Sequence, residues 1–200
     1  MVSASPSGSP RPLSSRWLDA VYVGYFLIHI PVTLLLDLQS IYPAAITPAW
    51  FRAIPVWYVG FSNDPLIAGA MGLVKSTPTE FAWLKSFMWL EVVFQLPLFF
   101  WGAYGLWKDS FSVYVPILIY GASTATTTLA CVALVLGTSS TSAATIEAGI
   151  ASVTSAQRAK LLADYLPFLF LPLLMVLDIG WRMYGLAVKG LKAEQAIKSK

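Results

Sequence analysis

The feature that most constrains the fold is a set of four long apolar stretches, at about residues 17–37, 83–107, 113–136 and 161–181. A helix needs about 20 mostly apolar residues to cross the hydrocarbon core of a bilayer, and each stretch meets this length. Tryptophans, whose rings favour the boundary between lipid and water, lie at the ends of these stretches: Trp17, Trp83, Trp107 and Trp181. We therefore predict an all-α fold, a polytopic membrane protein built as a four-transmembrane-helix bundle.

The composition excludes most other classes of protein. Apolar residues make up 57% of the chain and charged residues only 12%, against roughly 25% charged in an ordinary soluble domain. Single copies of cysteine (Cys131) and histidine (His29) argue against a zinc or iron–sulfur site built from several such residues, and we predict no cofactor and no metal. The net charge of +3 is small and does not indicate nucleic-acid binding.

The segments outside the stretches differ in character. Residues 1–15 are rich in Ser and Pro and are expected to form a disordered tail, followed by a membrane domain at 16–188 and a basic cytosolic tail at 189–200. The first loop, residues 38–82, is aromatic and proline-rich, which predicts interfacial helices covering one end of the bundle. Residues 137–160 are small and polar, and we expect a mobile loop there.

The distribution of basic residues predicts the orientation. Four spans place both termini on one side of the membrane. That side, with the short turn between the second and third spans, carries eight basic residues: Arg11, Arg16, Lys108, Arg182, Lys189, Lys192, Lys198 and Lys200. The opposite side carries five: Arg52, Lys75, Lys85, Arg158 and Lys160. The excess of positive charge favours cytosolic termini.

Polar residues recur within two of the spans. His29, Thr33 and Asp37 are spaced four residues apart and would share one face of the first helix. Glu91 and Gln95 would share a face of the second helix in the same way. Ionisable side chains at membrane depth cost about 2.5–3.5 kcal/mol on insertion scales, so each of them indicates a function by default.

Two carboxyl groups that meet in a low-dielectric site can share one proton through a hydrogen bond. Such a pair would attract a cationic or hydroxyl-bearing ligand. Structural roles remain open for each residue. Asp37 could be a solvated residue at the end of its span, Glu91 could serve only a hydrogen bond between helices, and His29 could be a core histidine.

Several motifs carry a resemblance to a known family: the run from Tyr25 to Gln39, Trp57-Tyr58, Asn63-Asp64-Pro65-Leu66, Lys85-Ser86-Phe87, the run from Glu91 to Pro97, and Tyr165-Leu166-Pro167. They resemble the EXPERA family of membrane proteins, in particular its sigma-2 receptor-like branch. The similarity covers roughly residues 17–185 and includes polar residues in register. Fungal-type members are also similar, and the emopamil-binding protein, a sterol isomerase, is a more distant relative.

The resemblance implies a multi-pass endoplasmic-reticulum membrane protein, often dimeric, with a pocket that opens sideways to lipid and binds sterols or amphipathic amines. It implies that Asp37 pairs with a ligand amine and that Glu91 hydrogen-bonds to Asp37. Asp64, Gln95, His29 and Tyr165 would lie at or beside the pocket. The polar loop at 137–160 and the Ser/Pro-rich start depart from the animal pattern.

Three functions remain open from the sequence. The first is binding of membrane lipids, sterols or amphipathic amines in lipid or protein trafficking, which the resemblance extends to delivery of mitochondrial precursors, as client proteins, from the endoplasmic reticulum surface. The second is a sterol-type double-bond isomerase, with Asp37, Glu91 and His29 as acid and base and Trp89, Tyr104 or Tyr120 stabilising a carbocation. The third is an assembly partner whose long aromatic loop docks a client protein. The resemblance to a non-enzymatic branch favours the first.

Overall fold

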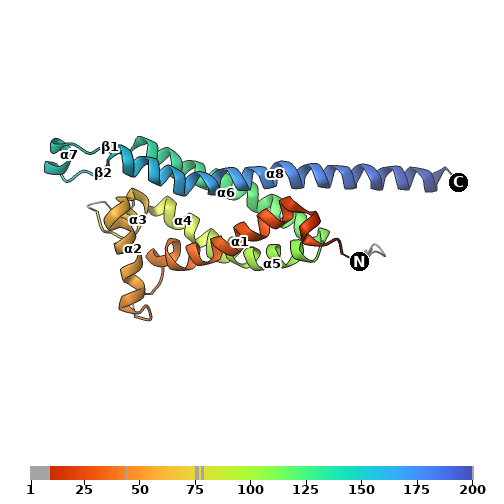
Figure 1. The fold of residues 1–200 in the computed structure, drawn as a ribbon, viewed down its shortest axis with the longest axis horizontal. Coiled ribbons are helices and arrows are strands. Elements are labelled where there is room, and N and C mark those ends of the chain that lie inside the picture. Colours follow the sequence, from red (N-terminus) through yellow and green to blue (C-terminus); the bar gives the residue numbers. More distant parts are fainter. Residues whose placement is uncertain (1–9, 44, 75–76, 78, 200) are drawn as a thin grey trace.

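The computed structural model describes residues 10–43, 45–74, 77 and 79–199. The chain is almost entirely helical, as predicted (Figure 1). Four helical segments are long and apolar enough to cross a membrane: Trp17–Ser40, Ala82–Trp107, Phe111–Gly137 and Ser155–Lys198. The predicted all-α bundle of four spans is therefore confirmed.

The first span consists of α1 (Trp17–Leu35) and a 3-10 turn at Asp37–Ser40. The second consists of α4 (Ala82–Leu90), a π-helical turn at Glu91–Gln95 and α5 (Leu96–Trp107). The third is a 3-10 turn at Phe111–Val113 followed by α6 (Tyr114–Gly137). The fourth is the single helix α8 (Ser155–Lys198). The described part of the first loop contains α2 (Ala49–Ser62) and α3 (Pro65–Ala70), in the segment where interfacial helices were predicted.

The spans pack in two pairs, α1 with α5 and α6 with α8. Residues without bulky side chains allow close approach at both crossings, as is common between membrane helices. A Cβ atom on Gly121 of α6 would lie 2.8 Å from the backbone oxygen of Pro172 in α8, and one on Gly102 of α5 would lie 3.1 Å from the ring of Phe26 in α1. Larger side chains at these two positions would force the helices apart.

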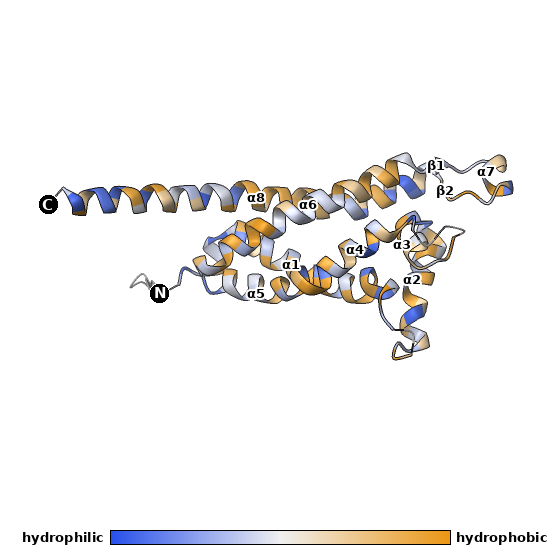
Figure 2. Ribbon diagram, turned by 180° about the vertical axis from the view of Figure 1, so that it is seen from behind, coloured by the Kyte–Doolittle hydropathy of each residue, from blue (hydrophilic) through white to orange (hydrophobic). Residues whose placement is uncertain are grey.

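Hydrophobic residues predominate along much of the four spans (Figure 2). Many of their large apolar side chains are exposed, among them Trp101, Phe100 and Leu177. The start of α1 and the end of α8 lie at one end of the bundle, and α2, α3 and α7 (Ala143–Glu147) lie at the other (Figure 1). This arrangement agrees with the predicted placement of both termini on one side.

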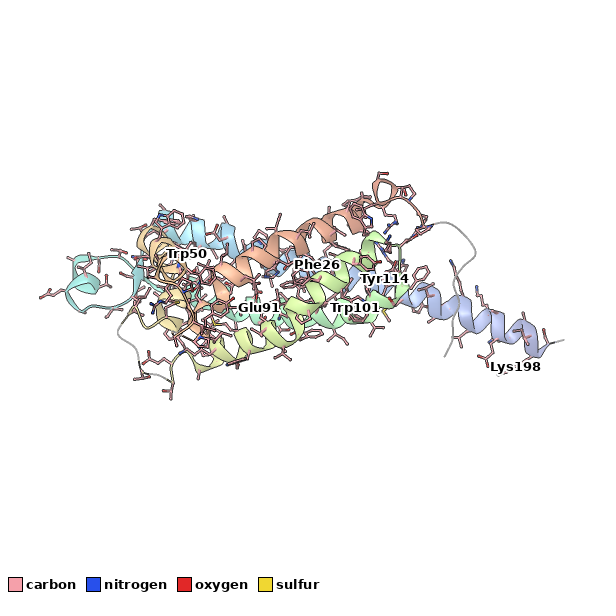
Figure 3. All side chains as sticks on the ribbon, turned by 90° about the horizontal axis from the view of Figure 1, so that it is seen from below. Phe26, Trp50, Glu91, Trp101, Tyr114 and Lys198 are labelled. Atoms are coloured by element: carbon pink, nitrogen blue, oxygen red, sulfur yellow. The ribbon has the colours of Figure 1, made fainter. Side chains whose placement is uncertain are left out.

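The terminal segments differ from expectation where they are described. Residues 10–15 were expected to be disordered, but Leu13–Ser15 form a 3-10 turn, and Arg11 binds Asp109 through two nitrogens. Residues 1–9 lie outside the described residues. At the other end, α8 continues past the predicted span and through the expected tail to Lys198, well beyond the bundle (Figure 3).

The segment at 137–160 is more structured than expected. β1 (Ser139–Ser140) pairs in parallel with β2 (Ser152–Val153), and α7 lies between them. Arg158 on α8 donates hydrogen bonds to the carbonyl groups of Val135, Leu136 and Thr138 at 2.6–2.8 Å. These carbonyls belong to the end of α6, where a helix leaves its last acceptors unpaired.

Candidate ligand-binding site

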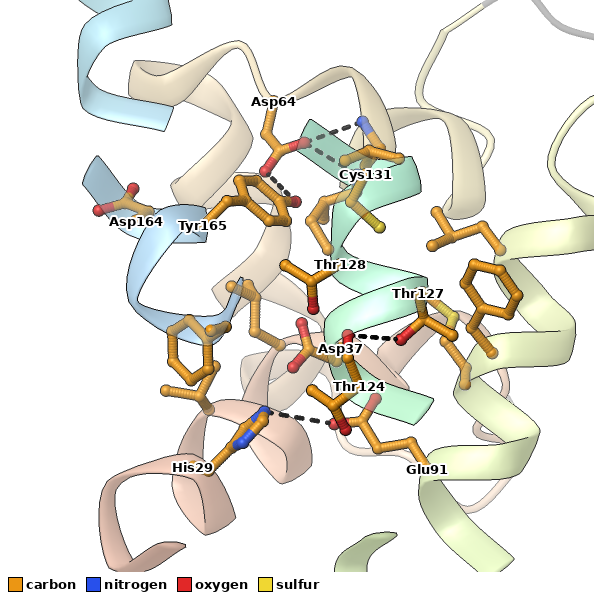
Figure 4. Close-up of a pocket in the computed structure, with 18 of the residues that line it drawn as sticks. His29, Asp37, Asp64, Glu91, Thr124, Thr127, Thr128, Cys131, Asp164 and Tyr165 are labelled. Atoms are coloured by element: carbon orange, nitrogen blue, oxygen red, sulfur yellow. Dashed lines mark hydrogen bonds and ion pairs between the residues drawn. The ribbon is translucent and has the colours of Figure 1, made fainter. Parts of the chain in front are cut away.

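A cavity of about 160 Å³ lies between the spans, near the end of the bundle that carries α2 and α3 (Figure 4). Residues of α1, α4, α6 and α8 line it, and most of the lining is apolar, including Leu84, Met88 and Phe168. Polar side chains also line it, including the four acidic residues Asp37, Asp64, Glu91 and Asp164. Apolar walls with converging polar groups are typical of small-molecule sites.

Asp37 and Glu91 both line this cavity, from the first and second spans respectively. One ligand atom from each of His29, Asp37 and Glu91 lies within 4.8 Å of the others. Asp37 begins the 3-10 turn that follows α1. Glu91 begins the π-helical turn in the second span, and such turns are frequent at functional sites. The two carboxyl groups therefore face a common chamber, as the sequence predicted.

Hydrogen bonds fix the orientation of Glu91 and His29. Thr33 Oγ1 donates to Glu91 Oε1 at 2.5 Å, which joins the first two spans. His29 Nε2 lies 3.8 Å from the same oxygen, and its Nδ1 lies 3.3 Å from the hydroxyl of Tyr120. That hydroxyl is in turn 2.9 Å from the hydroxyl of Tyr25. The result is a buried polar chain that runs from the cavity into the core.

The His29 ring is held between aromatic side chains. Its centroid lies 4.6 Å from the centroid of Phe99, with the rings nearly parallel, and 4.6 Å from that of Phe168. His29 is only 6% exposed. The histidine is thus both a packed core residue and part of the cavity wall. Its role in ligand binding stays a prediction.

Asp64 has a mainly structural environment. It caps α3, accepting from the backbone N–H groups of Leu66 and Ile67 at 2.8 and 3.2 Å. The hydroxyls of Tyr165 and Tyr58 also donate to it, at 2.9 and 3.2 Å. Burial raises the pKa of the Asp64 carboxyl, although these four hydrogen bonds act in the opposite direction. With its oxygens occupied, Asp64 is suited to hold Tyr58 and Tyr165 against the cavity.

An ion pair lies at the edge of the cavity nearest the loops. Lys160 Nζ is 2.9 Å from Asp164 Oδ2, and the ammonium also lies 6.0 Å from the centre of the Tyr58 ring. Tyr58 and Asp164 both line the cavity. This pair is partly exposed and lies between the chamber and the loop end of the bundle.

The predicted site residues divide into two groups. One group lines the cavity: His29, Asp37, Asp64, Glu91, Gln95 and Tyr165. Thr33 does not line it, but is fully buried behind Glu91. Ligand binding by any of them stays a prediction.

The sequence reasoning missed Tyr58, Phe168 and Asp164, because they reach the cavity only through the packing of α2 and α8 against the other helices. Thr124 was considered only as one member of a Ser/Thr cluster on the third span. Its hydroxyl is buried at the cavity.

Two aromatic residues proposed to stabilise a carbocation do not face the cavity. Trp89 and Tyr104 are 57% and 64% exposed and point to the lipid-facing surface. Tyr120 is buried next to His29. The aromatic rings that do line the cavity are those of Tyr58, Phe87, Tyr165 and Phe168.

The His29, Asp37 and Glu91 group also has the donor atoms of a metal site. One imidazole nitrogen and two carboxylates form a mixed ligand set. The prediction of no metal counted only cysteine and histidine and did not consider carboxylate ligands. The same atoms equally suit a ligand with a cationic head, and the apolar lining of the cavity favours such a ligand over a bare ion.

Four apolar helices around this cavity define a multi-pass membrane protein with an internal pocket. A match to EXPERA (EXPanded EBP superfamily) covers residues 50–179. The chain is 32% identical over 167 residues to Sigma intracellular receptor 2 of Homo sapiens, which covers 83% of this chain and 89% of that protein. The chain therefore belongs to the EXPERA family, and the resemblance inferred from the motifs is confirmed.

A second relative comes from fungi. The chain is 29% identical over 162 residues to Efficient mitochondria targeting-associated protein 19 of Saccharomyces cerevisiae. The match covers 76% of this chain and 91% of that protein. Similarity to both relatives extends over most of the membrane domain.

Proposed function

We propose that the protein binds a sterol or another amphipathic ligand with a cationic or hydroxyl head in its intramembrane cavity. The observation that carries this proposal is the position of Asp37 and Glu91 in one apolar chamber, with ligand atoms within 4.8 Å. A carboxylate shielded from water interacts strongly with a charged or hydrogen-bonding head group. The apolar walls accommodate the body of the ligand.

The size of the cavity limits which part of the ligand it encloses. At about 160 Å³ it resembles cavities that hold a single aromatic ring. We infer that the head and the first ring of the ligand are enclosed. The rest would extend into lipid between α4 and α6, where Phe87 and Thr127 line the cavity and are partly exposed.

The cellular role is proposed from the relatives. One is named as an intracellular receptor and the other as associated with mitochondria targeting. We propose that this protein resides in the endoplasmic reticulum membrane with cytosolic termini. There, ligand binding would serve lipid trafficking or the delivery of precursor proteins. A homodimer and client proteins belong to the same proposal.

Identification of bound lipids tests this function. Protein purified gently from membranes should carry a sterol or amphipathic lipid that mass spectrometry detects, and Glu91→Gln should lose most of it. Glu80→Gln provides a matched control, because Glu80 is exposed outside the spans. Equal lipid content in all three proteins, or none in the wild type, would contradict ligand binding in the cavity.

A second candidate is a sterol-type isomerase. It is favoured by the proximity of His29 to the carboxyl groups of Asp37 and Glu91, because double-bond migration needs an acid and a base on either side of the substrate. Expression in a strain lacking sterol Δ8–Δ7 isomerase distinguishes the two. We expect no rescue, and appearance of the isomerised sterol would establish the enzyme.

A further inference from the structure

A second hollow lies at the opposite end of the bundle, beside the starts of α1 and α6 and the extension of α8. Its volume is about 460 Å³. Four cationic side chains line it, namely Arg11, Arg16, Arg182 and Lys189. No acidic residue is among the residues that line it in the described part of the chain. We call it the basic groove.

Three aspartates outside the lining of the groove form ion pairs with its arginines. Asp19 pairs with Arg16 and, at 2.6 Å, with Arg182. Arg182 also binds Asp178 at 2.7 Å, and Arg11 binds Asp109 at 2.8 Å. These pairs set the direction of the guanidinium groups and leave one positive charge in excess around the groove. The burial of Asp19, which is 1% exposed, shows that the pairs are part of the packed structure.

Lys189 carries the excess charge. Among the described residues, no group hydrogen-bonds or pairs with its ammonium, and the side chain is exposed. Arg182, Gly185, Leu186 and Lys189 follow one face of α8, at positions i, i+3, i+4 and i+7. A Cβ atom on Gly185 would meet nothing within 4 Å, so this face of the helix is open to a ligand.

The groove lies at the depth of lipid head groups. Trp17 and Trp181 line it and are 68% and 76% exposed, which places two indoles beside the cations. Tryptophans with this exposure on membrane helices mark the interface between hydrocarbon and water. Basic pockets between membrane helices at this level bind anionic head groups. We propose that the basic groove binds the phosphate of an anionic phospholipid, independently of the ligand in the central cavity.

The test uses the full-length protein in nanodiscs that contain phosphatidylcholine and phosphatidic acid. Lipids retained after extraction into detergent are counted by native mass spectrometry. The wild type should retain phosphatidic acid in preference to phosphatidylcholine. Lys189→Gln, which removes the free charge, and Gly185→Leu, which fills the open face, should each reduce this preference several-fold.

Two neighbouring substitutions serve as controls. Lys192→Gln and Gly190→Leu make the same changes on α8 at residues that do not line the groove, and both should behave as the wild type. Lys189→Arg should also retain the lipid. Equal retention in all the proteins would overturn the proposal. Displacement of phosphatidic acid by inorganic phosphate would show a site for free phosphate and would equally overturn a lipid site.

Discussion

Thr33 and Glu91 form a direct hydrogen bond between the first two spans, with Thr33 Oγ1 donating to Glu91 Oε1 at 2.5 Å. Thr33 is fully buried, and the Glu91 side chain is 12% exposed. The bond holds one carboxyl oxygen of Glu91 against the first span. Its geometry therefore links the packing of the bundle to the shape of the cavity.

Substitution Thr33→Val tests this link. Valine keeps the shape of threonine but removes the donor, which leaves a buried carboxyl oxygen without its partner. We expect a loss of about 1–3 kcal/mol in stability, measured as a lower thermal unfolding temperature in detergent. Thr126→Val is the control, because Thr126 is exposed and bonds only to the Ala122 carbonyl of its own helix. An equal effect of both substitutions would argue against a structural role of the bond.

Asp64 is predicted to stabilise the loop end of the bundle. Asp64→Ala removes the cap of α3, worth about 1 kcal/mol, and leaves the Tyr165 hydroxyl without its acceptor, which costs about 1–3 kcal/mol more. The Tyr58 hydroxyl keeps a second acceptor, Asp164 Oδ2, at 3.4 Å. Asp64→Asn retains an acceptor for the backbone N–H groups of α3 and should be milder. Thermal unfolding separates the two variants. If both variants lowered the unfolding temperature by the same small amount, the four hydrogen bonds of Asp64 would not contribute to stability.

The ion pair of Arg11 and Asp109 predicts a pH-dependent contribution to stability. The Arg11 guanidinium lowers the pKa of Asp109 from 3.8 to about 2. A lowered pKa in the folded state means that the contribution is complete above about pH 4 and is lost as the pH falls through about 2. Because Arg11 is 61% exposed, solvent screening limits the contribution to about 1 kcal/mol or less.

Asp109→Asn measures that contribution. Asparagine tolerates the left-handed backbone of residue 109, whose φ is 55°. We expect the variant to unfold at a lower temperature than the wild type at neutral pH, and the difference to disappear as the pH approaches 2. A difference that stays constant over this pH range would exclude the ion pair as its cause.

A lateral opening between α4 and α6 can be tested at Thr127. Thr127→Trp would place a large ring where the cavity reaches the lipid-facing surface, and we expect slower association of a fluorescent sterol with the purified protein. Thr126→Trp makes the same change one residue away, on the exposed side of α6, and should leave the rate unchanged. Equal rates in both variants would place the entrance elsewhere.

The sequence predicted the spans well because hydropathy and tryptophan position report directly on the bilayer. It also indicated Asp37 and Glu91 as candidate site residues, because an ionisable side chain inside a membrane span is energetically costly and indicates a function. It did not predict that Thr33 would be buried against Glu91 and would not line the cavity, although Thr33 was expected on the same helix face as His29 and Asp37. Helical spacing defines a side of a helix, whereas contacts with the second span decide which residue reaches the cavity.

Long-range contacts explain the remaining differences. Tyr165 donates to Asp64 across 101 residues of sequence, and no local pattern connects α8 with the start of α3. The ordering of residues 10–15 depends on Asp109, which is 98 residues from Arg11. The extension of α8 has no long apolar stretch to mark it, because its last turns, residues 189–198, mix charged and polar residues with single apolar ones.

Binding of a long-chain tertiary amine to the detergent-solubilised protein, with Asp37→Asn beside the wild type, tests the central claim most directly. Loss of a charge-assisted hydrogen bond of about 1.5–3 kcal/mol should weaken binding at least tenfold. A neutral analogue with a hydroxyl in place of the amine should lose much less, and thermal unfolding should show that the variant is folded. Unchanged affinity for the amine in a folded Asp37→Asn protein would contradict an intramembrane site centred on this carboxylate.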